Sequence, residues 1–199
     1  MFVGLTGSTG CGKTSALECF SSFGWKTLDA DRICHELYDD PASGVPGAVR
    51  KRWGKKVFFP DGKINRGEIA DIVFRNRKEI LWLNSLLHPK VLEKARKEAR
   101  ESTNKDVIFA VPLLFEAGWK KEFGCVVSIW TDEEIQHERL KKRGWSEKEI
   151  SRRCRSQLSP ADKLGLADFA IINNGSLKSL FEQCKSLNKN IRKHYGKIC

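Results

Sequence analysis

The sequence has no long hydrophobic run and no paired cysteine motif. Its longest apolar stretch, VIFAVPLLF at 107–115, falls well short of the roughly 20 residues that a membrane-spanning helix needs. The first residues lead directly into a strand-like stretch, without the basic segment that opens a signal peptide. The seven cysteines are odd in number and include no C-x-x-C pair, which argues against a disulfide framework or a zinc site. We therefore expect a cytoplasmic protein with reduced thiols and no membrane contact.

Acidic residues are fewer than basic ones. The 36 lysines and arginines exceed the 25 aspartates and glutamates, which gives a formal net charge of +11. Such basicity suits either a nucleic acid or phosphate-rich small substrates. No recognised nucleic-acid motif accompanies it, and in 90–102 the charges mostly lie opposite an apolar helical stripe. We expect small-molecule substrates, no nucleic-acid partner, and a monomer or weak homo-oligomer.

Residues 7–14, GSTGCGKT, form a P-loop. The pattern G-x-x-x-x-G-K-[ST] is met between a predicted strand and a predicted helix. In such a loop the backbone N–H groups point at phosphate oxygens, and the following helix adds its positive N-terminal end. Lys13 can reach the β- and γ-phosphates, and the Thr14 hydroxyl can bind Mg²⁺. The pattern predicts a nucleotide site made by Gly7, Ser8, Thr9, Gly10, Cys11, Gly12, Lys13 and Thr14.

Two features of other P-loop proteins are missing. The third strand-like run reads VIFAVPLLFE, without the aspartate that ends this strand in GTPases and motor ATPases. The sequence also lacks an N-K-x-D-like motif that would read guanine. Their absence favours a small kinase.

Five strand-like runs alternate with helical patterns, near 2–6, 25–29, 107–112, 125–131 and 168–172. This alternation predicts an α/β fold of the P-loop kinase type, with a five-stranded parallel sheet flanked by helices. The interval between the second and third runs is far longer than the dozen or so residues of a direct crossover. We therefore expect a single kinase domain over 1–199, with a core (1–34, 105–131 and 160–199), a helical acceptor-binding insertion (about 35–104) and a basic lid (about 132–159).

Several local patterns predict where helices begin and end. Thr131 with Glu134, and Ser146 with Glu149, have the spacing of capping boxes that open two helices. His88 before Pro89 predicts a junction between two helices.

Two sets of charged residues are candidates for the chemistry. Asp31, in the DAD at 29–31, follows the second strand, where its carboxylate could accept a proton from an attacking hydroxyl or help to hold Mg²⁺. The alternative is that Asp31 only caps the helix after it. Arg139 and Arg143 lie four apart in a cationic segment suited to closing on a transferring phosphoryl group. For any single arginine a solvated helix surface is the better interpretation, but the cluster as a whole favours a lid.

A series of motifs runs along nearly the whole chain: GLTGSTGCGKT at 4–14, DAD at 29–31, DGKINR at 61–66, LHP at 87–89, PLLFE at 112–116, Arg139, Arg143, Arg153, Gln157, Lys163, Ala167, Asp168, Ile171, Asn173 and Gly175. In their order and spacing these motifs resemble the dephospho-CoA kinase family. The departures are Ser8 and Thr9 in place of a Gly-Ile pair and Cys11 in place of a serine; Ser8 adds a side chain at a loop position that is usually bare.

The resemblance implies ATP-dependent phosphorylation of the ribose 3′-hydroxyl of dephospho-CoA, which yields coenzyme A and ADP with Mg²⁺ as cofactor. It implies that the catalytic residues are Asp31, Lys13, Arg139 and Arg143. ATP would be held by the P-loop together with Arg139, Arg143, Asn173 and Gly175. The acceptor would be held by Asp31, Arg66, His88, Leu113, Phe115 and Glu116.

Three other functions fit parts of the sequence. Another small P-loop kinase, acting on a nucleoside or nucleoside monophosphate, would share the P-loop and the lid but not PLLFE after the third strand. An ATP-using nucleic-acid-binding protein would share the basic charge, and a nucleotide sensor without turnover would not need Asp31.

Overall fold

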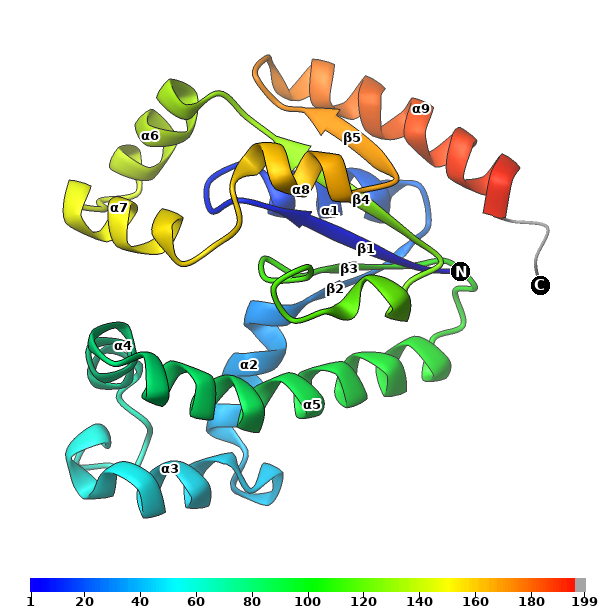
Figure 1. Cartoon of the computed structure of the whole chain (residues 1–199). Helices are drawn as coiled ribbons and strands as arrows, with labels where there is room; N and C mark the ends of the chain where they lie inside the picture. Colours follow the sequence, from blue (N-terminus) through cyan, green and yellow to red (C-terminus); the bar gives the residue numbers. More distant parts are fainter. Residues whose placement is uncertain (196–199) are drawn as a thin grey trace. The chain divides into compact units, whose positions relative to one another are not determined.

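The computed structural model describes residues 1–195. Five parallel strands form one sheet in the order β2-β3-β1-β4-β5, and helices flank it (Figure 1). The strands are β1 (Phe2–Gly7), β2 (Lys26–Asp29), β3 (Val107–Ala110), β4 (Cys125–Trp130) and β5 (Phe169–Ile172). The predicted α/β class and all five predicted strands are confirmed.

The α-helices range in length from 7 to 25 residues. They are α1 (Lys13–Ser22), α2 (Ala30–Asp39), α3 (Val45–Trp53), α4 (Arg66–Arg75), α5 (Arg77–Glu101), α6 (Glu133–Lys142), α7 (Glu147–Arg155), α8 (Pro160–Leu166) and α9 (Leu177–Tyr195). Short 3₁₀ turns occupy Pro41–Ser43, Gly54–Val57 and Trp119–Glu122. Among residues 1–195, no helix is both long enough and apolar enough to cross a membrane.

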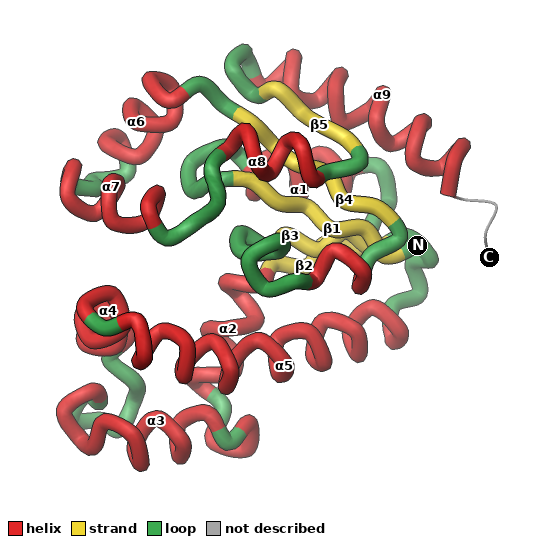
Figure 2. The backbone as a smooth tube through the Cα atoms, viewed as in Figure 1, coloured by secondary structure: helices red, strands yellow, loops and turns green. Residues whose placement is uncertain are grey.

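The chain divides into two compact units. Unit 1 contains Met1–Asp29 and the chain from Ala99 onward, and therefore the whole sheet; unit 2 is Ala30–Glu98. Unit 2 is built from helices and loops, with one isolated bridge between Phe58 and Ile64 (Figure 2).

In unit 1 the central strand β1 separates two layers of side chains. Val3 and Leu5 are buried in a core that includes residues of α1 and α9. Gly4, which points the other way, has room only for its hydrogens, because an added Cβ would lie 2.7 Å from Leu114 and 3.0 Å from Phe123. The helix α8 packs against β1 and β4. The P-loop thus leaves the middle of the sheet with packed layers on both sides.

One predicted helix junction is wrong. His88 and Pro89 lie inside the continuous helix α5 rather than between two helices. The buried residues Leu83, Leu87, Val91 and Ala95 repeat every four positions through this region, while Pro89 itself is exposed. Burial of this stripe outweighs the roughly 3 kcal/mol that an interior proline costs a helix.

One of the two predicted capping boxes is also wrong. Ser146 and Glu149 form the predicted box at the start of α7, with reciprocal side-chain and backbone hydrogen bonds. At α6 the residue before the helix is Asp132, and no side-chain hydrogen bond caps it. The Thr131 hydroxyl is bound elsewhere, as described below.

Candidate active site

Backbone conformation explains the glycines of the P-loop. Gly10 has φ +85°, and Gly12, which precedes α1, has φ +102°, a region that other residues rarely adopt. Gly12 also faces a close neighbour, because an added Cβ would lie 2.2 Å from Asn173 Nδ2. The loop therefore requires glycine at position 12 for two independent reasons.

The start of α1 is suited to an anion. Gly12 offers no side chain to cap the helix, so the first N–H groups of α1 are left for another acceptor. The helix dipole adds positive potential at the same point, which favours a phosphate group. Thr14, the second residue of α1, is exposed there.

Lys13 folds its ammonium group back over the loop. Its Nζ donates to the carbonyl oxygens of Gly7 and Ser8, at 2.8 and 3.0 Å. These contacts hold the positive charge at the loop itself, where a bound phosphate chain would need it.

Two side chains hold the Cys11 carbonyl group, and a third supports one of them. Asn173 Nδ2 and Thr131 Oγ1 both lie within hydrogen-bonding distance of the Cys11 carbonyl oxygen, at 2.8 and 3.2 Å. Arg139 in turn donates to the carbonyl oxygen of Asn173 at 3.0 Å. Asn173 is only 6% exposed, and its backbone N–H donates to the carbonyl oxygen of Trp130 at the end of β4. The ends of β4 and β5 therefore fix the shape of the P-loop.

The front of the loop is held by two glutamines. Gln136 on α6 donates to the backbone carbonyl of Thr9. Gln157, which follows α7, donates to the Thr9 hydroxyl at 3.3 Å. Thr9 is one of the three residues that depart from the family pattern, and here its hydroxyl joins the P-loop to the segment after α7.

A tight turn follows β3, and we call residues 112–118 the β3 turn. Leu114 is fully buried beneath it, whereas Leu113 and Phe115 are half-buried. Glu116 Oε1 accepts a hydrogen bond from the Leu158 N–H at 2.7 Å and lies 3.1 Å from Lys163 Nζ. One oxygen of the Glu116 carboxylate is thus engaged within the protein.

Three predicted site residues lie in unit 2. Asp31 is exposed in the first turn of α2, two residues beyond the end of β2. Arg66 is exposed at the first position of α4. Burial raises the pKa of Tyr38, and the positive charge of Arg66 opposes part of that rise. His88 is half-buried in α5, and burial lowers its pKa, so its neutral form is favoured.

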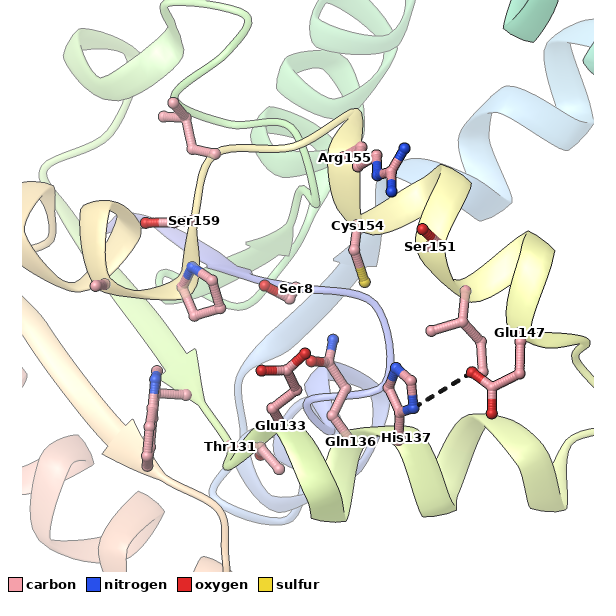
Figure 3. Close-up of a pocket in the computed structure, with 15 residues that line it drawn as sticks. Ser8, Thr131, Glu133, Gln136, His137, Glu147, Ser151, Cys154, Arg155 and Ser159 are labelled. Atoms are coloured by element: carbon pink, nitrogen blue, oxygen red, sulfur yellow. Dashed lines mark ion pairs between the residues drawn. The ribbon is translucent and has the colours of Figure 1, made fainter.

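A cavity of about 730 Å³ opens beside the first residues of the P-loop (Figure 3). Ser8 is the P-loop residue in its wall; Thr131 and side chains from α6 and α7 form much of the remainder. His137 of α6 and Glu147 of α7 point toward each other in its wall, with 3.6 Å between Nδ1 and the carboxylate. The cavity therefore lies next to the phosphate loop rather than inside it.

The structure brings some of the predicted site residues together and leaves others apart. Arg139 and Asn173 join the P-loop in one hydrogen-bonded cluster. Arg143 lies just beyond the last turn of α6 and is exposed, as is Gly175 after β5. Sequence reasoning assigned no role to Gln136, and nothing local marks it, because its partner lies 127 residues away.

Comparison with known proteins identifies the family of this chain. The model of the family described as dephospho-CoA kinase matches residues 1–179. A dephospho-CoA kinase of Carboxydothermus hydrogenoformans is 36% identical over 185 residues, covering 91% of this chain and 89% of that protein.

Solved structures share the fold over almost the whole chain. The dephospho-CoA kinase of Campylobacter jejuni has a TM-score of 0.67 at 29% identity, covering 96% of this chain and 97% of that one. A Thermus thermophilus protein reaches a TM-score of 0.81 at 24% identity, covering 96% and 97%, and supports the fold alone. With its P-loop braced by the ends of β4 and β5, and with PLLFE in the turn after β3, this chain belongs to the dephospho-CoA kinase family.

Proposed function

We propose that this protein transfers the γ-phosphoryl group of ATP to the ribose 3′-hydroxyl of dephospho-CoA, which gives coenzyme A and ADP, the last step of coenzyme A synthesis. The observation that carries the proposal is the braced P-loop, with Lys13 over its mouth, in a chain of this family. We place this reaction in the cytoplasm, where ATP is abundant.

Charge neutralisation is the main task of such a site. The triphosphate would occupy the loop, where the N–H groups at the start of α1 and the Lys13 ammonium group would face its oxygens. Lys13 would exchange its contacts with the Gly7 and Ser8 carbonyls for phosphate oxygens. Arg139 would act in the same cluster by fixing the carbonyl of Asn173, and Arg143, which is exposed at the end of α6, would contact the phosphates directly.

Asp31 would serve the attacking hydroxyl. Its carboxylate follows β2, and in an open parallel sheet ligands bind beyond the carboxyl ends of the strands. There it would take the 3′-hydroxyl proton or hold the hydroxyl in line with the γ-phosphorus. The acceptor would be bound by Arg66, His88, Leu113, Phe115 and Glu116.

Mg²⁺ would enter with the nucleotide. Among residues 1–195 no group of three or more His, Cys, Asp or Glu side chains is arranged to hold a metal ion. That fits a hard cation bound mainly by phosphate oxygens and water, with few protein ligands. Thr14, exposed at the start of α1, is the protein hydroxyl that we assign to it. Bound there, the ion would neutralise charge on the transferring phosphoryl group.

ADP release from ATP tests the proposal most directly. The acceptor should be dephospho-CoA in one reaction and AMP, CMP, adenosine or 4′-phosphopantetheine in the others, each with ATP and Mg²⁺. We expect turnover with dephospho-CoA alone, and the product should carry its new phosphate at the 3′ position by ³¹P NMR. Turnover with a nucleoside monophosphate instead would overturn the acceptor assignment but keep the P-loop assignment. No turnover with any acceptor would favour a nucleotide sensor.

A further inference from the structure

Lys163 is a lysine in the interior of unit 1. Its side chain, on α8, is 1% exposed, and lysine is almost never buried to this degree unless it is paired. Nζ donates to the carbonyl oxygen of Pro112 at 2.5 Å and lies 3.1 Å from Glu116 Oε1. Both partners belong to the β3 turn. Lys163 has no role in the mechanism of phosphoryl transfer proposed above.

The contacts continue beyond the β3 turn. The same Glu116 oxygen accepts the N–H of Leu158, in the connection between α7 and α8. The preceding residue, Gln157, donates to the Thr9 hydroxyl of the P-loop. A line of hydrogen bonds therefore runs from α8 through the β3 turn to the end of α7 and on to the phosphate loop.

A gain in stability does not by itself explain why Lys163 is paired with Glu116 in the interior. Burial lowers the pKa of Lys163, and Glu116 opposes that effect, so desolvation offsets part of the attraction between the two charges. Apolar side chains of similar volume often stabilise a protein as well as a buried ion pair does. A charged pair, however, accepts only a narrow range of geometries, and this one also fixes the backbone at Pro112 and Leu158.

We propose that Lys163 is a positioning residue for phosphoryl transfer, which holds the β3 turn, and with it Leu113 and Phe115, in register with the connection after α7. The inference rests on the proposed function, because the β3 turn matters to the reaction only if it binds the acceptor. With its side chain 1% exposed, Lys163 would act through Pro112 and Glu116 rather than by contact with a substrate.

Loss of the Lys163 ammonium group should therefore lower the rate of reaction with the acceptor more than it lowers ATP affinity. The nucleotide loop keeps its own supports at Cys11 when Lys163 is changed. The β3 turn would lose its contacts with the ammonium group, and a misplacement of about 1 Å can cost on the order of 100-fold in rate.

The test compares Lys163→Met, Glu116→Gln and the double variant with the wild-type protein. Lys120→Met is the matched control, because Lys120 also joins the segment after β3 to α8, donating to the Leu166 carbonyl at 2.6 Å, but its side chain is 47% exposed. For each protein we would measure kcat and KM for dephospho-CoA, ATP affinity by calorimetry, the unfolding midpoint, and amide hydrogen exchange over 112–118 and 157–159.

We expect Lys163→Met to lower kcat/KM for dephospho-CoA at least about 10-fold while ATP affinity changes less than about 3-fold. Exchange should quicken in the two measured segments and not in α1. Because Lys163 acts through Glu116, the losses in the double variant should be smaller than the sum of the single losses. Lys120→Met should match the wild-type protein.

Three results would overturn the inference. One is a normal kcat/KM in the Lys163→Met protein that remains folded; another is an equal fall in ATP affinity and kcat/KM; the third is strict additivity of the two single changes. If Lys163→Met does not fold, Lys163→Arg, which keeps the positive charge but changes its contacts with Pro112 and Glu116, decides by the same kinetic and exchange criteria. Absence of turnover in the wild-type protein would overturn the proposed function and this inference together, whereas normal turnover in the variants would overturn the inference alone.

Discussion

At the scale of single residues, Gly12 shows how tightly the phosphate loop is specified. Its φ of +102° disfavours any side chain, and Asn173 occupies the place where a Cβ would be. The two constraints have different consequences. Backbone strain costs stability, while displacement of Asn173 would release the Cys11 carbonyl and change the shape of the loop.

Gly12→Ala should therefore abolish ATP binding and lower the free energy of unfolding by about 1–3 kcal/mol. Gly24→Ala is the control, because Gly24 has φ +83° but no heavy atom within 4 Å of an added Cβ. It should cost about 1 kcal/mol and leave ATP binding intact. Urea unfolding and ATP calorimetry on both variants check this. Equal ATP affinity in the two would contradict the role of Asn173.

Asp31 is the residue whose chemistry was least constrained by sequence, since the same position suits a catalytic base and a helix cap. Asp31→Asn should keep ATP affinity within a few-fold and lower turnover by about 100-fold or more, because the amide cannot accept the hydroxyl proton. Asp39→Asn, an exposed change at the other end of the same helix, is the control and should not alter turnover. Near-normal turnover of Asp31→Asn in an ADP-release assay would remove Asp31 from the chemistry.

At the scale of secondary structure, sequence patterns worked where the interactions are local. Apolar runs located all five strands, and the Ser146 capping box was found from a spacing of three residues. Thr131 has the same spacing to an acidic residue, yet its hydroxyl contacts the carbonyls of Cys11 and Asn173, 120 and 42 residues away. No local pattern contains those partners. The P-loop was evident from its own residues, but the side chains that brace it were not.

The capping box of α7 allows a prediction about that helix alone. Ser146→Ala removes the hydroxyl that accepts from the Glu149 N–H and should destabilise the helix by about 1 kcal/mol. Amide exchange should quicken in α7 and stay unchanged in the sheet. Ser159→Ala, which removes the corresponding cap of α8, should instead quicken exchange in α8. Unchanged exchange in α7 after Ser146→Ala would show that tertiary packing, not the cap, holds its first turn.

At the scale of the whole molecule, buried thiols make stability depend on pH. Burial raises the pKa of both Cys125 and Cys184 to about 12. In the unfolded chain these thiols would ionise near pH 8.5. Between those pH values the unfolded state is stabilised by losing protons that the folded state retains. The contribution of the thiols to the free energy of unfolding is therefore fully present below about pH 8.5 and is lost as the pH rises.

Urea unfolding at pH values from about 7.5 to about 10.5 should show this decline, with a slope approaching 1.4 kcal/mol per pH unit for each thiol. Cys184→Ala should be less stable at neutral pH, because it leaves a small void, but its stability should decline more gently with pH. A slope unchanged by this substitution would assign the alkaline loss of stability to other groups, such as Tyr38, whose pKa is also raised by burial.

The packing of α1 against α9 has a consequence for the synthesis of the protein. Leu17 and Phe20 of α1 share a core with Leu180, Cys184 and other residues of α9, and Trp25 Nε1 donates to Asn188 Oδ1, 163 residues further along the chain. At about 5–20 residues per second, a ribosome needs on the order of ten seconds or more to cover that interval. During this time the apolar face of the helix that follows the phosphate loop has no partner from α9, so the growing chain depends on chaperones, or on transient contacts of its own, to keep that face from aggregating.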